Sequence, residues 1–201
     1  FFEFEKINKE KFGYSDCAIG NIVIAGAFLE SKRNFNDAID YLVSKFDVSL
    51  KILNITDGEN LYLSAIKSDG QILADEAAIV EQQNKVAIKE ILLFKEKYKL
   101  KSNINSDIDK FIKEISKDSV LPNPNKKALD ALENANFIIY GPGTQHSSLF
   151  PSYLTIGVAE SIVKNNKAEK IFIGNVKTDN EIEVETVNTL CIKLHHFLSR
   201  R

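Results

Sequence analysis

The sequence predicts an α/β fold, and three observations support this prediction. Short apolar runs that suit strands alternate with longer segments whose apolar residues recur at helical spacing. Near the C-terminus the order is strand, glycine turn, helix, strand, polar turn and helix, which is typical of a parallel sheet covered by helices. A length of 201 residues, of which 44% are hydrophobic, suits a single domain with a substantial core. We therefore expect one domain over residues 1–201, with a parallel sheet flanked by helices, a small hairpin and a helical excursion.

The first predicted element is a mostly buried helix within residues 14–31. Ser15 and Asp16 are good N-cap residues, and apolar residues follow them at helical spacing. Gly20 and Asn21 lie near the start of this helix. Because an asparagine within an apolar helix needs a hydrogen-bonding partner, these two residues are candidates for ligand binding.

The next segments predict a helix, a strand and a hairpin. The helix covers residues 35–46, has one apolar face, and is capped by Asn34 or Asn36. The run SLKILNIT at 49–56 predicts a strand. Two short apolar runs on either side of Ser-Asp-Gly at 68–70 predict the hairpin.

The rest of the chain predicts three more strands, each paired with a helical segment. The lysine-rich tract 96–119 predicts an amphipathic surface helix, whose role is packing or that of a lid. Prolines directly precede another predicted helix, as is typical of a helix start. The predicted strands lie at 85–95, 136–141 and 168–175, the last two buried and parallel, and the further helices at 121–135, 155–166 and 184–201.

The strand at 136–141 runs into the main candidate site, a glycine loop rich in hydroxyls. Ligands of open parallel sheets bind beyond the carboxyl ends of the strands. Glycines let backbone N–H groups approach a ligand, and hydroxyls at a helix N-terminus can cradle a phosphate. The alternative is a plain connection between a strand and a helix. The candidate binding residues are Gly141, Pro142, Gly143, Thr144, Ser147 and Ser148.

A second polar turn follows the strand at 168–175. Asn175 and Thr178 come just after the apolar run, with Asp179 beside them, and can offer neutral hydrogen bonds to a base or a sugar. The alternative is an Asx turn with a helix cap. His146, within the glycine loop, either touches a substrate or faces solvent, and we favour the solvent-facing interpretation.

The composition argues against several classes of protein. The net charge of −2 gives no electrostatic reason to expect nucleic-acid binding. No apolar run reaches the roughly 18 residues of a membrane span, so no membrane is expected. Cys17 and Cys191 fit no metal-ligand spacing, and without a signal peptide we expect a reduced cytoplasmic protein. The three histidines are too scattered in the sequence for a metal site. The phosphate-loop lysine of classical NTPases is missing, and no catalytic residue can be assigned from the sequence.

Four segments resemble the CofD-like superfamily, which includes the 2-phospholactate transferases and the YvcK-like proteins. They are the glycine loop, the segment ahead of it, the start of the first helix and the polar turn after the strand at 168–175. GPGTQHSSLFPSYLTIGVAESI resembles the family segment GPGS-x-x-TS-x-x-P-x-x-x-x-x-G-I-A-E-A-I. LPNPNKKALDALENANFIIYGPG is similar to the proline, short helix and strand that precede it. SDCAIGNIVIAGAF aligns Gly20 and Asn21 with the family segment GHSLGNLLLAAL, and IFIGNVKT aligns Asn175 and Thr178 with a strand that ends in Asn-x-x-Thr.

This resemblance implies a Rossmann-like sheet and a missing N-terminal segment. Family members begin with a strand followed by Gly-Gly-Gly-Thr-Gly and later carry an acidic Asp-Asp-Gly-Gly-Ser stretch, and neither is present here. We therefore expect this chain, which does not begin with methionine, to be the C-terminal two-thirds of a longer protein. Any magnesium ligands are then expected in the missing part, with no metal ligand in this chain.

Two branches of the superfamily imply different functions. One transfers a phospholactyl-type group from a guanosine diphosphate donor to a deazaflavin, and the YvcK-like branch binds nucleotide sugars. The GPG-Thr form with a downstream Ser-Ser resembles the YvcK-like branch. Three features depart from the family pattern. Gln-His replaces the common Leu-Tyr, the tract 96–119 is an apparent insertion, and the Gln-Pro-Gly-Glu-Thr and Tyr-Ser that usually follow the Asn-x-x-Thr turn are missing. The expected function is binding of a nucleotide or nucleotide sugar, with its phosphate at the GPGT loop. A magnesium-dependent transferase and a non-catalytic regulator of cell-wall or carbon metabolism are the alternatives, and a homodimer is left open.

Overall fold

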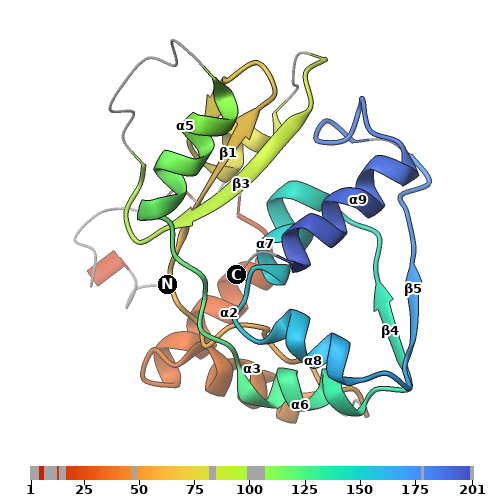
Figure 1. Cartoon of the computed structure of the whole chain (residues 1–201). Coiled ribbons are helices and arrows are strands. Elements are labelled where there is room, and N and C mark those ends of the chain that lie inside the picture. The colour runs from red at the N-terminus through yellow and green to blue at the C-terminus, as the bar shows by residue number, and fades with distance from the viewer. Residues whose placement is uncertain are drawn as a thin grey trace. The chain divides into compact units, whose positions relative to one another are not determined.

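The computed structural model shows an α/β chain of helices and two small sheets, which confirms the predicted class (Figure 1). The chain divides into two compact units, Phe1–Gly58 and Glu59–Arg201, each described by itself below. The single domain expected over 1–201 stays a prediction. The structure describes residues 5–6, 13, 17–46, 49–81, 85–98, 107–177 and 179–199.

The first unit contains two helices, α2 (Ile19–Glu30) and α3 (Phe35–Lys45). Asn34 caps α3, as predicted, because its side-chain oxygen accepts the N–H of Asp37 at 3.1 Å. The rings of Phe28 and Phe35 pack at a centroid distance of 6.5 Å and join the two helices.

Two predictions for this unit are wrong. Helix α2 is not mostly buried: Ala27 is its one buried residue, the others are exposed or half-buried, and Ile19 is 80% exposed. No strand forms over 49–56, every residue of which is described. The amide of Asn54 donates instead to the backbone oxygen and the hydroxyl of Thr56, and such local bonds compete with strand pairing. The predicted caps Ser15 and Asp16 lie outside the described residues.

The second unit begins with an antiparallel sheet in the order β2-β1-β3. Strands β1 (Tyr62–Lys67) and β2 (Ile72–Leu73) form the predicted hairpin, and β3 (Ile88–Phe94) pairs with the other edge of β1. Helix α5 (Ile108–Ile115), which is the described part of the helix predicted in 96–119, packs its apolar side on this sheet. The prediction of an amphipathic covering helix is therefore confirmed for residues 108–115.

A parallel pair of strands forms the second sheet. β4 (Phe137–Tyr140) and β5 (Glu169–Phe172) run in register from Phe137 opposite Glu169, so the predicted parallel pairing is confirmed. The prediction that both strands are buried is wrong: Ile138 is buried, whereas Phe137 is 59% exposed. Ile138 is the one buried residue of β4, and the four residues of β5 are exposed or half-buried.

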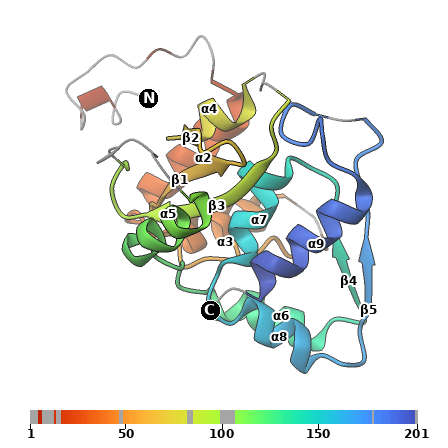
Figure 2. The same cartoon turned by 45° about the horizontal axis from the view of Figure 1, so that its top comes forward.

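Helices flank this pair and build the core. Helix α6 (Lys126–Asn134) leads into β4, and the crossover to β5 runs through η3 (Gln145–Leu149), α7 (Phe150–Tyr153) and α8 (Val158–Lys164). Helix α7 contacts both β3 and α9 (Val187–Leu198) and lies between them (Figure 2). The fully buried rings of Phe150 and Phe197, 4.8 Å apart, lie at this contact in the main apolar cluster. The remaining elements are α4 (Glu76–Val80) and η2 (Ser116–Asp118).

Candidate functional site

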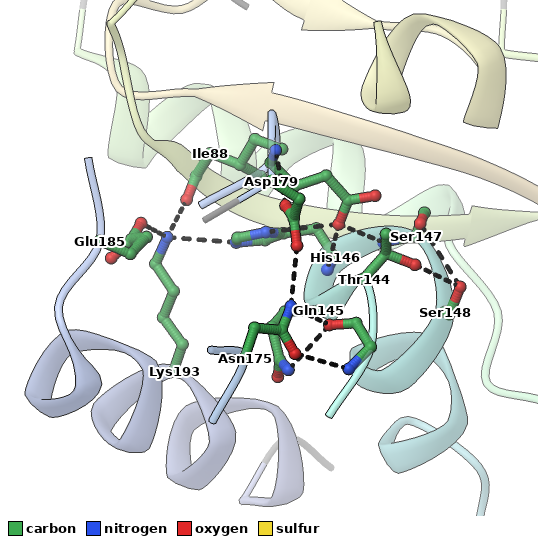
Figure 3. Close-up of polar contacts among 12 residues, drawn as sticks. Ile88, Thr144, Gln145, His146, Ser147, Ser148, Asn175, Asp179, Glu185 and Lys193 are labelled. Atoms are coloured by element: carbon green, nitrogen blue, oxygen red, sulfur yellow. Dashed lines mark hydrogen bonds and ion pairs between the residues drawn. The ribbon is translucent and has the colours of Figure 1, made fainter. Parts of the chain in front are cut away.

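The loop Gly141–Thr144 connects the carboxyl end of β4 to the wide helical turn η3. The N–H groups of Ser148 and Leu149 both donate to the backbone oxygen of Thr144, which closes the turn. Because of this turn, the hydroxyls of Thr144 and Ser148 lie 2.7 Å apart, with the Ser147 hydroxyl 3.5 Å from that of Ser148 (Figure 3). Ser148 is exposed, so this group of hydroxyls is open to solvent on one side.

Asn175, just beyond β5, holds the loop from the neighbouring strand end. Its side-chain oxygen accepts the N–H of Gly143 at 2.8 Å, and its amide donates to the backbone oxygen of Gly143 at 3.0 Å (Figure 3). The same amide donates to the carboxylate of Asp179 at 2.9 Å. The two strand ends that the sequence singled out therefore meet, and Asn175 joins them.

Glu181 was missed by the sequence interpretation, although it lies closest to the expected anion site. One of its carboxylate oxygens accepts the backbone N–H groups of His146 at 2.8 Å and of Ser147 at 3.1 Å. Burial raises the pKa of Glu181, and hydrogen bonds from Ser147 and from the backbone of His146 lower it. The helical turn does attract an anion, as its N-terminal N–H groups should, but the anion comes from the protein itself.

His146 is fully buried, so the prediction that it faces solvent is wrong. Its Nε2 lies 3.2 Å from Nζ of Lys193, which also donates to the backbone oxygen of Ile88 and pairs with Glu185 (Figure 3). Burial and the positive charge of Lys193 lower the pKa of His146 to about 3. The ring is therefore neutral at pH 7.

The remaining predicted residues lie elsewhere. Gly20 and Asn21 belong to the first unit, where both are exposed on the first turn of α2. Asn21 therefore meets solvent and does not need the protein partner that its sequence context predicted. Thr178 lies outside the described residues. The residues that the structure brings together are Gly141, Pro142, Gly143, Thr144, Ser147, Ser148 and Asn175.

Sequence signals for the missed residues are weak. Glu181 belongs to the polar turn 174–181 but stands at its end, and one acidic residue in a polar turn carries no signal of its own. Lys193 lies on the last helix among apolar residues, where a lysine usually extends its amine to solvent. Only the fold shows that both side chains point to the same short turn.

Among the described residues, no group of three or more histidine, cysteine, aspartate or glutamate side chains could hold a metal ion. None of the helices in the described part of the chain is both long and apolar enough to cross a bilayer.

A parallel strand pair with a hydroxyl-bearing glycine loop at its carboxyl end is typical of α/β proteins that bind a ligand at a sheet end. The chain belongs to the CofD family: the family model described as 2-phospho-L-lactate transferase CofD matches residues 6–200.

Individual relatives support this family membership. The chain is 28% identical to a gluconeogenesis factor of Listeria innocua over 164 residues, which cover 82% of the chain and 42% of the relative. It is 26% identical over 168 residues to a gluconeogenesis factor of Halalkalibacterium halodurans, and these residues cover 84% of the chain and 43% of the relative. The chain thus spans less than half the length of these curated relatives.

A solved structure shows the same fold. The crystal structure of a UPF0052 family protein from Bacillus halodurans superposes with a TM-score of 0.69 at 22% sequence identity, over 98% of this chain and 55% of the other.

Proposed function

We propose that the protein at its full natural length binds a nucleoside diphosphate, and by preference a nucleotide sugar. The site is the edge formed by the GPGT loop (Gly141–Thr144 with Ser147 and Ser148) and by the segment 174–181. One observation carries this proposal: Asn175 ties the carboxyl ends of two parallel strands together beneath an exposed group of hydroxyls. Such an edge can bind phosphate oxygens or sugar hydroxyls by positioning and hydrogen bonding.

Calorimetric titration of the full-length protein with UDP-N-acetylglucosamine, UDP and GDP tests this proposal. At least one of the three ligands should bind, and Thr144→Val should weaken the binding of the nucleotide sugar by about 1–2 kcal/mol, since it removes one hydroxyl at nearly constant volume. Ser199→Ala removes an exposed hydroxyl at the end of α9 and is the matched control. Absence of heat with all three ligands at millimolar concentration would contradict the nucleotide proposal.

A transferase of phosphorylated groups is the second candidate, because the matching family model is described as a 2-phospho-L-lactate transferase. In that case Thr144, Ser147 and Ser148 would orient the transferred group. Magnesium would neutralise the charge of the diphosphate. Release of a nucleoside monophosphate from a guanosine diphosphate-linked donor, dependent on magnesium and a deazaflavin acceptor, would support this candidate.

A non-catalytic regulator of carbon or cell-wall metabolism is the third candidate, since the relatives are named gluconeogenesis factors. The apolar side of α5 packs on the antiparallel sheet, which leaves its charged side for a partner. Reversing the charges of that side should then abolish capture of a partner and leave nucleotide binding intact.

A homodimer is also a proposal, and sedimentation of the full-length protein tests it.

A further inference from the structure

We propose that the GPGT loop binds the neutral, hydroxyl-bearing part of the ligand, the sugar of a nucleotide sugar, and does not bind a phosphate. This inference rests on the function proposed above and assigns one part of the ligand to one part of the site.

Most of the backbone N–H groups of residues 141–149 are already used within the protein. Gly143 donates to Asn175, and His146 and Ser147 donate to Glu181. The next two N–H groups, of Ser148 and Leu149, donate to the backbone oxygen of Thr144. A phosphate that used any of these five groups would have to displace a side chain or break the turn, whereas phosphate loops keep such donors free for the ligand.

The charge around the loop also disfavours a phosphate. The carboxylate of Glu181 lies under the turn with its side chain only 1% exposed, and Asp179 lies beside Asn175. Residues 141–149 contain no lysine or arginine. The ammonium of Lys193 pairs with Glu185. A phosphate bound at the loop would therefore approach two carboxylates. Against them the segment 174–181 offers one exposed lysine, Lys177.

Hydroxyl groups are what the loop offers to a ligand. The hydroxyls of Thr144 and Ser148 form one hydrogen bond with each other, and each has further donor or acceptor capacity left. Oε1 of Gln145 and Oε1 of Glu181 are buried acceptors without a hydrogen-bonding partner among the described residues. Acceptors and mixed donor-acceptor groups suit the hydroxyls of a sugar, because a sugar hydroxyl can donate where a phosphate oxygen at neutral pH cannot.

Calorimetry on the full-length protein with UDP and with UDP-N-acetylglucosamine separates the two parts of the ligand. We expect the nucleotide sugar to bind at least about tenfold more tightly than UDP. Thr144→Val and Ser148→Ala should each weaken the affinity for the nucleotide sugar by about 5- to 30-fold. Both should leave the affinity for UDP within about twofold. Ser199→Ala should change neither affinity.

Glu181→Gln tests the charge argument directly, since glutamine keeps an acceptor for the two N–H groups but carries no charge. We expect no gain in UDP affinity from this variant. A tenfold gain, or an equal loss of UDP and nucleotide-sugar affinity in Thr144→Val, would place a phosphate at the loop and overturn the inference.

Two further outcomes would also overturn it. If UDP and UDP-N-acetylglucosamine bind equally and neither responds to Thr144→Val or Ser148→Ala, the inference fails and so does the proposed place of the site, while nucleotide binding itself stands. If the protein binds neither ligand, the inference fails, and nucleotide binding fails with it only if GDP does not bind either. Melting curves of each variant show whether a change in affinity comes with a change in folding.

Discussion

Asn175 satisfies both backbone groups of Gly143, accepting its N–H at 2.8 Å and donating to its oxygen at 3.0 Å. These two groups lie in a loop that follows β4, where the ladder between β4 and β5 has ended. The asparagine side chain thus takes the place of one more residue of strand. It fixes the height of the GPGT loop above the sheet, and with it the position of the Thr144 hydroxyl.

Replacing Asn175 should destabilise the protein and weaken ligand binding together. Asn175→Ala leaves the N–H and oxygen of Gly143 without their partner, which should cost about 1–3 kcal/mol in the free energy of unfolding. Asn175→Asp keeps the acceptor but brings a second carboxylate against Asp179, so it should not rescue the loss. Chemical denaturation measures both variants, with the exposed Asn188→Ala as control. A stability unchanged within about 0.5 kcal/mol in Asn175→Ala would show that the clamp is dispensable.

Gly143 has a backbone φ of +152°, which residues with a side chain rarely adopt. A Cβ at this position would meet Leu149 at 3.6 Å, an ordinary contact, so the cost of Gly143→Ala comes from the backbone alone. We expect a loss of about 1–3 kcal/mol. Gly143→Val should also abolish ligand binding if the backbone lies against the ligand.

Gly141→Ala is the matched control for this loop. A Cβ at Gly141 would meet no atom within 4 Å, and its φ lies outside the strained range. Melting curves of the two alanine variants should therefore differ clearly. Equal melting temperatures would show that the conformation of Gly143 is not a constraint.

The buried His146 should make stability depend on pH between about 3 and 6.5. Its pKa is lowered from 6.5 to about 3, so in this window the unfolded chain binds a proton that the folded protein does not bind. The contribution of His146 is therefore fully present above pH 6.5 and is lost as the pH falls, with a slope of up to about 1.4 kcal/mol per pH unit.

His146→Gln should flatten this dependence, while the exposed His195→Gln should not. The quantity to compare is the difference in unfolding free energy between wild type and variant at each pH. Burial raises the pKa of Glu181, and this makes stability fall with rising pH above the ordinary pKa of a glutamate, which is opposite to the effect of His146. Unfolding free energies measured by urea denaturation at several pH values provide the test. Parallel curves for wild type and His146→Gln would mean that the pKa of His146 is the same in the folded and the unfolded protein.

Helix α5 should matter for folding through its apolar side. Ile115 is 7% exposed and belongs to the cluster with Ile66, Leu92 and Phe94. Ile115→Ala should cost about 2–5 kcal/mol, because it leaves a cavity against the sheet. Lys113→Ala, on the exposed side of the same helix, should stay within about 0.5 kcal/mol. If Ile115→Ala is as stable as the control, α5 is not a structural cover and its role as a docking element gains support.

Local patterns in the sequence were sufficient for most of the elements. The turn at 68–70 predicted the hairpin because Gly70, at a φ of +88°, supplies the conformation that the turn needs. Asn34 was predicted as a cap from its side-chain chemistry and its place before an apolar face. Apolar content alone could not distinguish strand from coil at 49–56, where the amide of Asn54 donates to the backbone oxygen of Thr56 and no strand forms.

The candidate site could be predicted only in part. Glycine and hydroxyl chemistry pointed to Gly143, Thr144 and Asn175, and the structure brings all three together. The burial of His146 and the contact of Glu181 with the turn depend on how α9 and the segment 174–185 pack, which no local pattern encodes. The exposed face of β4 was missed for the same reason, since apolar runs do not reveal which neighbours cover them.

The pairing of β4 with β5 also bears on the order of folding. Gly143 and Asn175 are 32 residues apart, whereas the hairpin joins Ala65 to Leu73 through a short turn. Closing the longer segment costs more chain entropy, and contacts distant in sequence slow folding. We therefore expect the site to be completed after the hairpin. A ligand that contacts the finished loop should mainly slow unfolding and leave the folding rate nearly unchanged.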